Sequence, residues 1–530
     1  ADPQAVALAQ RLGVALNCYG FAQTSGTAPV QTSRDGIYVC GAFQEPKDIP
    51  HSVMEASAAA ACAGERLAAA RWSLTQTKEL PPETDVDGQP PRIGVFVCNC
   101  GINIGGVADV PAVREYARTL PHVVHVEDNL FTCSQDSQVH IKEVIKEKQI
   151  NRVVVASCSP RTHEPLFQET IREAGLNKYL FEMANIRDQN TWVHMNNPAK
   201  ATAKAKDLVR MAVAKSAHIE PLYHVSVPIT KAALVVGGGV AGLEAALGVA
   251  EQGCDVHLVE RDSRLGGNAR HLRSTWQGDD LPAYLKGLAE RVQSHPRIQL
   301  YLNSEVTATH GTLGNITSVL TDSAGNDRTI AHGATILAVG AREHKPTEFL
   351  YGKHANVMTH LDMDAALTRN DPRMQTAACA VFIQCVGSRN NDRPYCSKIC
   401  CTHSLKGALA LKAKNPNMKV FILYRDIRAY GFREQLYQEA RAQGVVFIRY
   451  DLENPPSAAI ADNDQLLLTV TDHVLRRPIR IKPDLLILAA GIVAADNHRL
   501  FALFKVPVNE DGFLVEAHAK LRPVDFASEG

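Results

Sequence analysis

The chain has 530 residues, 45% of them hydrophobic and 21% charged, which is typical of folded globular proteins and excludes disordered or collagen-like chains. At about 150 residues per domain, this length predicts three or four domains. Lysine plus arginine and aspartate plus glutamate each total 56, so no excess positive charge exists to attract nucleic acid or an anionic membrane.

The chain shows no membrane-spanning pattern. Its longest apolar stretch, from Leu485 to Ala495, is about half of the roughly 20 residues that a membrane helix needs, and it predicts a buried strand. The sequence opens with Ala1 and lacks the pattern of a signal peptide, so we expect an excised piece of a longer protein. The 13 cysteines are too few for a disulfide scaffold and fall largely in tight groups, which favours thiolate ligands in a reducing cytoplasm.

Two segments near the ends of the chain repeat each other. Val14–Phe21 and Val506–Phe513 share Val, Asn, Gly and Phe in register. A second match pairs Pro29–Gly36 with Pro523–Gly530. Two matches in the same order predict a tandem protein, of which this chain holds the end of one copy and most of the next. The alternative is independent use of similar turns around glycine.

Residues 1–75 are therefore expected to be the C-terminal end of a preceding flavoprotein unit. Ile37–Gly41 predicts a short buried strand closed by Gly41, and Ser52 to Glu55 predicts a capping box that opens a helix reaching Ala70. A strand, a tight turn and a helix N-terminus together cradle anions. We expect this segment to close an FAD domain, with Gly41 facing the cofactor, and residues 76–91 to be a linker.

In residues 92–222, strand and helix patterns alternate, which predicts a parallel α/β domain. The expected strands are Ile93–Val97, Val123–Val126, Val153–Ala156 and Tyr179–Glu182. The first three strands are each followed by cysteine, and the four residues are Cys98, Cys100, Cys133 and Cys158. Because the carboxyl ends of parallel strands line one crevice, these thiols could converge on an iron–sulfur cluster or zinc. The alternative is that each is a small buried hydrophobic residue.

Residues 223–345 begin with a dinucleotide-binding pattern. A strand at Ala232–Val236 precedes a GxGxxG turn, and a helix follows through Ala250. The glycines of the turn are Gly237, Gly239 and Gly242. Glycines at these positions let the backbone approach a pyrophosphate at a helix N-terminus. The strand–turn–helix context predicts a Rossmann domain that binds a nucleotide.

Later residues of this domain indicate FAD. Glu260 ends the next strand, where a carboxylate accepts from the adenosine ribose and disfavours a 2′-phosphate. Gly266 and Gly267 form a second glycine element that resembles the one marking FAD rather than NAD in this superfamily. The returning strand, from Thr335, ends at Gly340.

After a connector at 346–376, residues 377–490 predict a second Rossmann-like domain, and 491–530 a truncated return to the FAD domain. The first strand of the second Rossmann-like domain, Ala380–Gln384, ends without a GxGxxG turn. Four cysteines follow instead: Cys385, Cys396, Cys400 and Cys401. Four soft ligands beside Lys398 and Lys406 suit a cubane iron–sulfur cluster, with zinc as the competing interpretation. Dithiol chemistry is disfavoured, because the CxxC spacing is absent and adjacent cysteines pair poorly.

Six short stretches carry a family resemblance. They are Ile383–Arg389, Tyr395–Ser397, Cys400-Cys401, Phe96–Gly101, Ala156–Arg161 and Phe181–Arg187. These stretches resemble the A subunit of heterodisulfide reductase and its relatives, the flavin and iron–sulfur core of electron-bifurcating or confurcating complexes. The resemblance covers essentially the whole chain. It implies an N-terminal α/β iron–sulfur domain followed by a thioredoxin-reductase-like flavoprotein of two dinucleotide-binding domains.

The resemblance also implies roles for individual residues. It makes Cys385, Cys396, Cys400 and Cys401 ligands of a 4Fe-4S cluster close to FAD, and it favours a second cluster on the four cysteines of residues 92–222. Lys406 lies one helical turn past the cysteine pair, where the resemblance suggests a charge near the flavin N5; a solvated helix lysine is the alternative. Ferredoxin-like CxxCxxCxxxCP inserts, common in the family, are absent from this chain.

The predicted function is FAD- and 4Fe-4S-dependent electron transfer within a multi-subunit complex. By resemblance, its partners would be other redox subunits, such as a hydrogenase, a formate dehydrogenase or a quinone-linked module. An NAD(P)H-dependent disulfide reductase is a second interpretation, disfavoured by the missing second glycine turn. A scaffold with degenerate cofactor sites is a third, disfavoured by Glu260 and the intact first turn.

Overall fold

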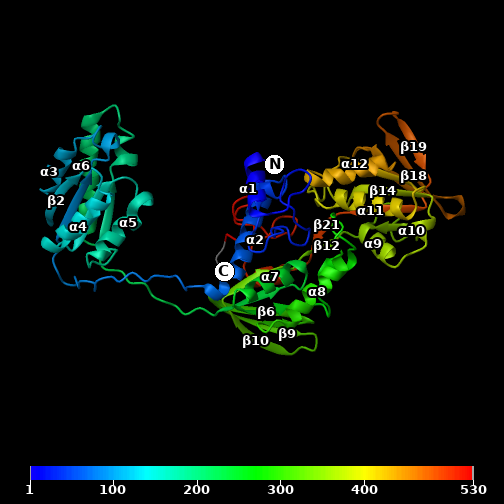
Figure 1. Ribbon diagram of the computed structural model, residues 1–530, viewed down its shortest axis with the longest axis horizontal. Coiled ribbons are helices and arrows are strands. Elements are labelled where there is room, and N and C mark those ends of the chain that lie inside the picture. The colour runs from blue at the N-terminus through cyan, green and yellow to red at the C-terminus, as the bar shows by residue number, and fades with distance from the viewer. Residues whose placement is uncertain (1, 528–530) are drawn as a thin grey trace. The chain divides into compact units, whose positions relative to one another are not determined.

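The computed structural model describes residues 2–527 and divides into two compact units (Figure 1). Unit 1 combines the segment up to Ser73 with the segment from Pro228 onward, and unit 2 is Leu74–Val227. Unit 2 is therefore inserted between two stretches of sequence that fold together. Within residues 2–527, no helix has both the length and the apolar character needed to cross a membrane.

Unit 2 is built on a four-stranded parallel sheet with the strand order β2-β1-β3-β4. Its strands are β1 (Ile93–Cys98), β2 (Val123–Asn129), β3 (Arg152–Ser157) and β4 (Phe181–Asn185). Its helices are α3 (Val110–Ala117), α4 (Gln135–Glu147), α5 (Pro160–Glu173) and α6 (Pro198–Ser216), with short turns η3 (Gly101–Asn103) and η4 (Arg187–Thr191). Strands β1 and β3 are buried at every residue, because apolar clusters cover both faces of the sheet. The predicted parallel α/β arrangement is confirmed.

Glu127 on β2 lies in a hydrogen-bonded cluster with two histidines. Its carboxylate accepts from Nε2 of His125 at 3.1 Å, from Nε2 of His140 at 3.0 Å and from Nδ2 of Asn129 at 3.1 Å. Burial alone raises the pKa of this carboxyl group, but the hydrogen bonds outweigh burial and lower the pKa to about 2. The ionised carboxylate therefore contributes to the stability of unit 2.

The first half of unit 1 contains a parallel sheet with the order β11-β5-β6-β7. Its strands are β5 (Ala232–Val236), β6 (Asp255–Val259), β7 (Ile298–Tyr301) and β11 (Ala334–Leu337), and its helical segments are α7 (Val240–Glu251), η5 (Gly267–His271) and α8 (Leu281–Ser294). An antiparallel sheet of β8 (Ser304–Thr312), β9 (Asn315–Asp322) and β10 (Asp327–His332) precedes β11. The predicted strand, glycine turn and helix from Ala232 onward are confirmed.

The second half of unit 1 contains a five-stranded parallel sheet with the order β13-β20-β14-β15-β16. Its strands are β13 (Val357–Thr359), β14 (Cys379–Val386), β15 (Lys419–Tyr424), β16 (Val446–Arg449) and β20 (Leu485–Ala490). Its helical segments are α9 (His360–Thr368), α10 (Arg373–Thr376), α11 (Cys400–Lys414), η6 (Gly431–Arg433) and α12 (Glu434–Ala442). The sequence expected to be a connector thus carries β13 and α9, and β13 pairs with the buried strand β20.

Smaller elements join or extend the two halves of unit 1. An antiparallel sheet consists of β17 (Ser457–Ala461), β18 (Gln465–Asp472) and β19 (Arg477–Ile481), with η7 (Asp462–Asp464) between the first two. The pair β12 (Ala341–Glu343) and β21 (Ile492–Ala494) joins the chain leaving the first sheet to the chain returning from the second. Helix α13 (His498–Leu503) then packs against β8, because Leu500 and Leu503 contact the apolar cluster of the first sheet.

The N-terminal segment differs from its prediction in two details. It contains α1 (Pro3–Leu12), η1 (Gly41–Phe43), α2 (Ile49–Leu67) and η2 (Ala68–Ala70). The expected strand at 37–41 is wrong, since Tyr38 makes only an isolated bridge to Gln31. The expected capping box is also wrong, because Asp48 caps α2 by accepting from the N–H of His51, and Glu55 instead accepts from the N–H of Gly41.

The two repeated sequence segments form the same hydrogen-bonded loop. In the first, the side-chain oxygen of Asn17 accepts from the backbone N–H groups of Tyr19 and Phe21, and the backbone N–H of Asn17 donates to the carbonyl of Phe21. In the second, Asn509 makes the corresponding bonds to Asp511 and Phe513. The same asparagine chemistry therefore sets both turns. The last part of the second match, at 528–530, lies outside the described residues.

We predict that unit 2 loses stability in acid through Glu127. A carboxyl group whose pKa is lower in the folded state stabilises the fold above its unfolded value of 4.5 and loses that contribution as the pH falls toward 2. Glu127→Gln should cost about 2 kcal/mol at neutral pH and flatten the acid dependence over this range. Calorimetry of the full chain across this pH range measures both effects. Exposed Glu143→Gln on α4 is the control, and equal acid dependence in the two variants would contradict the prediction.

Candidate functional site

The glycine turn after β5 has the steric features of a phosphate-binding loop. A Cβ atom on Gly237 would lie 2.3 Å from the carbonyl oxygen of Ala338, and one on Gly242 would lie 1.8 Å from the carbonyl oxygen of Gly237. A Cβ atom on Gly239 would meet no atom within 4 Å. Two glycines are thus required by packing, whereas Gly239 presents open backbone at the N-terminus of α7, where a pyrophosphate would bind.

The remaining expected nucleotide residues lie around this turn. Glu260 accepts from the N–H of Gly238 at 2.6 Å and from the N–H of Asp262 at 2.8 Å, so its carboxylate is held beside the loop. Gly266 bridges to Gly239 and donates to the carbonyl of Gly238 at 2.7 Å, which brings the second glycine element onto the first. Gly340 follows β11 with open space around its α-carbon.

Gly267 and Gly41 complete the expected set. Gly267 is close to the turn, since its Cβ atom would lie 3.2 Å from the α-carbon of Gly239. Gly41 differs, because its N–H donates to Glu55 at 2.9 Å and is already bonded within the N-terminal segment. The structure therefore gathers Gly266 and Gly267 at the first turn and leaves the N–H of Gly41 engaged elsewhere.

The four cysteines of the second domain gather where β14 ends and α11 begins; we call them the β14 cysteine set. Cys385 lies within β14 rather than after it, at a bulge in the pairing with β20, and its backbone has a positive φ of 61°. The four thiols lie near enough to raise one another's pKa: Cys396 acts on Cys385, and both of these act on Cys400 and Cys401. The set consists of Cys385, Cys396, Cys400 and Cys401. Burial raises the pKa of Cys400 to about 12 and that of Cys401 to about 11, so as free thiols they stay protonated.

Gln384 is an unsatisfied polar residue next to this set. Its side chain is fully buried, and neither its Nε2 nor its Oε1 has a hydrogen-bond partner. Leaving a buried amide unpaired costs free energy on the order of 1–3 kcal/mol, so such a group indicates a missing partner. Side-chain alternation along β14 puts Gln384 on the face of Phe382, which packs against α11. A group bound by the β14 cysteine set would lie close to this amide.

Lys406 connects the cysteine helix to the nucleotide domain. It lies on α11, and its Nζ donates to the carbonyl of Ser274 at 2.5 Å, in the loop after the second glycine element. Burial lowers the pKa of this amine, and Arg273 lowers it further while Asp364 opposes the shift. Lys406 is thus a partly desolvated cation between the two domains rather than a solvated surface lysine.

The cysteines of unit 2, which we call the β1 cysteine set, lie at the carboxyl edge of its sheet. Cys98 accepts from the N–H of Thr132, and Cys100 and Cys158 affect each other electrostatically. Cys133 packs against the apolar cluster that contains Cys158. Burial raises the pKa of Cys98 and of Cys158. The set consists of Cys98, Cys100, Cys133 and Cys158, which end or follow the three neighbouring strands β1, β2 and β3.

Neither cysteine set forms a closed metal cage. Over residues 2–527, no group of three or more His, Cys, Asp or Glu side chains has the arrangement that holds a single metal ion. The donors are nevertheless eight soft thiols in two groups, and the unpaired amide of Gln384 lies at one of them. The chemistry of the donors and the missing hydrogen-bond partner fit an iron–sulfur cluster, whose size exceeds that of one ion.

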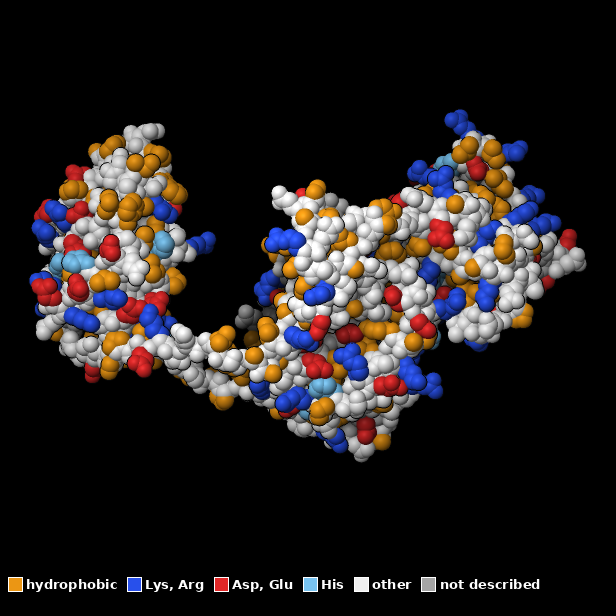
Figure 2. Space-filling view, viewed as in Figure 1, with side chains coloured by type: hydrophobic (Ala, Val, Ile, Leu, Met, Phe, Trp, Pro, Cys, Tyr) orange, Lys and Arg blue, Asp and Glu red, His pale blue; other side chains and the backbone are white. Residues whose placement is uncertain are grey.

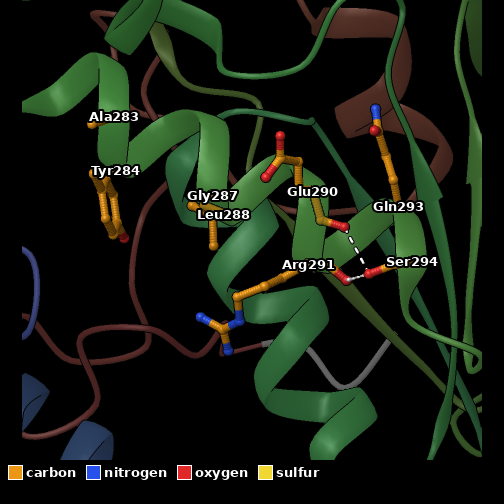
Figure 3. Close-up of a pocket in the computed structure, with 8 residues that line it drawn as sticks. All are labelled: Ala283, Tyr284, Gly287, Leu288, Glu290, Arg291, Gln293 and Ser294. Atoms are coloured by element: carbon orange, nitrogen blue, oxygen red, sulfur yellow. Dashed lines mark hydrogen bonds between the residues drawn. The ribbon is translucent and has the colours of Figure 1, made fainter.

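Two hollows of unit 1 differ in their relation to these residues. The larger, about 820 Å³, runs along α8 alone and contains no cysteine or turn glycine, so it is not the candidate site (Figure 3). The smaller, about 350 Å³, lies at the carboxyl ends of three neighbouring strands. One arginine comes from each strand end, namely Arg389, Arg425 and Arg449. The smaller hollow, through Arg389, is thus the one that adjoins the cysteine-bearing end of β14.

Comparison with known proteins assigns the family. Residues 231–382 match the pyridine nucleotide-disulphide oxidoreductase family. Over 83% of its length the chain is 36% identical to the A subunit of the H(2):CoB-CoM heterodisulfide,ferredoxin reductase of Methanothermobacter marburgensis, and it covers 81% of that protein. An iron-sulfur A subunit of the CoB–CoM heterodisulfide reductase of Methanopyrus kandleri is 35% identical with the same coverage. The chain belongs to the family of heterodisulfide reductase A subunits.

This membership confirms the resemblance seen in the sequence and makes the chain an oxidoreductase with a flavoprotein domain. Among solved structures, the thioredoxin reductase of T. acidophilum is 15% identical over 56% of this chain and 89% of that chain, with a TM-score of 0.38.

Three residues of the site were not assigned a role from the sequence: Gln384, Arg187 and Arg389. They stand inside the stretches that carry the resemblance, but only the structure shows their contacts.

We predict that Gly239→Ala separates flavin binding from folding. The added methyl group meets no protein atom, so the flavin-free variant should be as thermally stable as flavin-free native protein, but the methyl group projects where the pyrophosphate would bind. We expect at least about tenfold weaker FAD retention, measured from the flavin absorbance of purified protein. Gly287→Ala on α8, also free of contacts, is the control. Full flavin content in Gly239→Ala would contradict the assignment of the turn.

Proposed function

We propose that the chain carries electrons between FAD in unit 1 and two 4Fe-4S clusters, one on each cysteine set. The observation that carries the proposal is that Cys385, Cys396, Cys400 and Cys401 lie close together at the start of α11. Lys406 of the same helix reaches the nucleotide domain. When bound, such clusters exchange single electrons, and a flavin exchanges one or two. The protein's contribution is to hold the groups, exclude water and place charge.

The β14 cysteine set would supply the ligands of the cluster nearest FAD. Burial keeps water away from Cys400 and Cys401, and metal binding would displace their protons, because only the thiolate is a ligand. The amide of Gln384 would donate to the cluster or to a ligand sulfur, which satisfies its buried donors. The bulge at Cys385 turns that sulfur out of the regular alternation of the strand.

Residues of the first sheet would hold FAD. Gly237, Gly239, Gly242 and Glu260 would contact the pyrophosphate and ribose, with Gly266, Gly267 and Gly340 lining the same path. Lys406 would place a positive charge between this domain and the cysteine helix, where it stabilises negative charge on a bound flavin. NAD(P)H oxidation in the second domain is disfavoured, because a cysteine bulge stands at the end of β14 in place of a phosphate-binding turn.

The N-terminal segment would close the FAD domain. Helix α2 runs beside α7, since Arg71 donates to the carbonyl of Gln252 at 3.4 Å and Glu65 lies beside Gly248 (Figure 1). At its other end, Asp48 interacts electrostatically with Lys398 of the cysteine stretch. These contacts support the expected role of residues 1–75, followed by the linker at 76–91, the iron–sulfur domain at 92–222 and the flavoprotein domains beyond.

Unit 2 has an exposed apolar surface that suits a redox partner in a multi-subunit complex. At the edge of its sheet that carries the β1 cysteine set, exposed apolar side chains come from three loops: Ile102, Leu130, Phe131, Trp192, Val193 and Met195. Figure 2 shows hydrophobic side chains on this end of unit 2, opposite its linkers. Such surfaces mark interaction sites. We propose a hydrogenase, a formate dehydrogenase or a quinone-linked module as partner.

The cytoplasm is the proposed location. All 13 cysteines lie among the described residues and none forms a disulfide. Free thiols persist in reducing compartments, and unoccupied ligand thiols would be oxidised elsewhere.

We predict that anaerobically purified protein contains about eight iron atoms and eight sulfides per FAD, since each 4Fe-4S cluster holds four of each. Cys400→Ser should remove about half of the iron and leave the flavin. Cys254→Ser, outside both sets, should change neither. Metal and sulfide analysis with flavin absorbance measures all three quantities. Flavin without iron would favour a disulfide reductase, and neither group would favour a scaffold.

We predict that Lys406→Met lowers the reduction potential of the bound flavin. Removing a partly buried cation destabilises the negatively charged reduced flavin. The potential is measured by redox titration of the flavin absorbance. Lys412→Met, six residues later on α11, is the control. An unchanged potential in Lys406→Met would leave this lysine as a structural contact to Ser274 alone.

A further inference from the structure

Two arginines donate to cysteine sulfurs, one in each cysteine set. Nη1 of Arg187 lies 3.9 Å from Sγ of Cys100. Nη1 of Arg389 lies 3.8 Å from Sγ of Cys385. Across the described part of the chain, no other cationic side chain donates to a cysteine sulfur, including the five cysteines outside the two sets.

The recurrence is independent of local structure. Arg187 opens the η4 turn after β4 in unit 2, whereas Arg389 follows the bulged end of β14 in unit 1. Arg187 approaches a cysteine 87 positions away in sequence, and Arg389 one only four positions away. The two contacts share neither a turn type nor a sequence spacing. What they share is a guanidinium placed against one sulfur of a four-cysteine set.

Each guanidinium is fixed in place by a second contact. Nη2 of Arg187 lies 3.6 Å from Asp188, and its guanidinium lies over the ring of Trp192 at 4.9 Å. Arg389 forms an ion pair with Asp426. The side chains of Arg187 and Arg389 are only 20% and 17% exposed, so their charges are weakly screened by solvent.

The contacts of Arg187 are incomplete. Its buried Nε has no hydrogen-bond partner, and neither does Oδ2 of Asp188. A buried guanidinium donor left unpaired is costly and indicates a group that is still to be bound. A cluster on the β1 cysteine set would bring further sulfur acceptors to this donor.

We propose that Arg187 and Arg389 are positioning residues that raise the reduction potentials of the two iron–sulfur clusters. The proposal rests on the proposed function, with the thiol sulfurs standing in for ligand sulfurs of the bound clusters. Reduction adds one negative charge to a cluster, and a fixed positive charge at a ligand sulfur stabilises the reduced form. Hydrogen bonds to cluster sulfurs act in the same direction.

The test uses the full chain, purified without oxygen, with iron analysis followed by redox titration of the cluster signals in electron paramagnetic resonance. Native protein with iron is required first, since iron-free native protein would defeat the proposed function itself. Arg187→Gln should lower the potential of one cluster and Arg389→Gln that of the other. We expect at least a tenfold change in the ratio of reduced to oxidised cluster at a given potential, which is about 59 mV for one electron.

Lysine variants and surface controls separate charge from folding. Arg187→Lys and Arg389→Lys keep the charge and should recover part of each shift with full iron content. Arg210→Gln in unit 2 and Arg369→Gln in unit 1 remove exposed arginines and should move neither potential. Native-like potentials in both glutamine variants with full iron would overturn the proposal. Loss of iron in both the glutamine and the lysine variants would also overturn it, because the arginines would then only hold the ligand loops together.

Discussion

The burial of thiols at the carboxyl edges of parallel sheets is the constraint on which the rest of this protein depends. A buried thiol keeps its proton unless a metal or a positive charge compensates the thiolate, as the raised pKa values of Cys400 and Cys401 indicate. The surroundings of each set supply part of that compensation in the form of an arginine and nearby unpaired polar groups. The sheets supply convergence, because neighbouring parallel strands end at the same edge.

The nucleotide-binding turn lies at the corresponding carboxyl edge of the other parallel sheet of unit 1, but it suits a ligand of different chemistry. At the end of β5 the chain exposes backbone N–H groups through Gly239, which suits a phosphate. At the end of β14 it presents sulfur through the bulge at Cys385. Two similar strand–helix units thus offer different ligand atoms because of a few residues at their turns. Lys406 links them by reaching from the cysteine helix to the loop of the first domain.

Much of this arrangement could be predicted from the sequence, because it depends on short-range patterns. The glycines at 237, 239 and 242 specify a turn that few other sequences tolerate, and apolar runs bounded by cysteine specify buried strands. The prediction of a strand at 37–41 was wrong because Tyr38 finds only one bridging partner. The prediction of a cap at Ser52 was wrong because Asp48, four residues earlier, accepts from the N–H of His51 and starts the helix there. The contacts of Arg187 with Cys100 could not be predicted, since they join residues 87 positions apart through the pairing of whole strands.

The insertion of unit 2 also has a consequence for how the protein is made. Residues up to Ser73 are synthesised before unit 2, yet their packing partners in unit 1 begin only at Pro228. Tyr19 stacks on Phe432, Phe21 contacts the same ring edge-on, and Arg71 donates to the carbonyl of Gln252, so these side chains must wait for much later residues. Unit 2 is one continuous segment and can fold in the interval. The segment up to Ser73 therefore reaches its native contacts only after the whole of unit 2 and part of the sequence beyond it have been made.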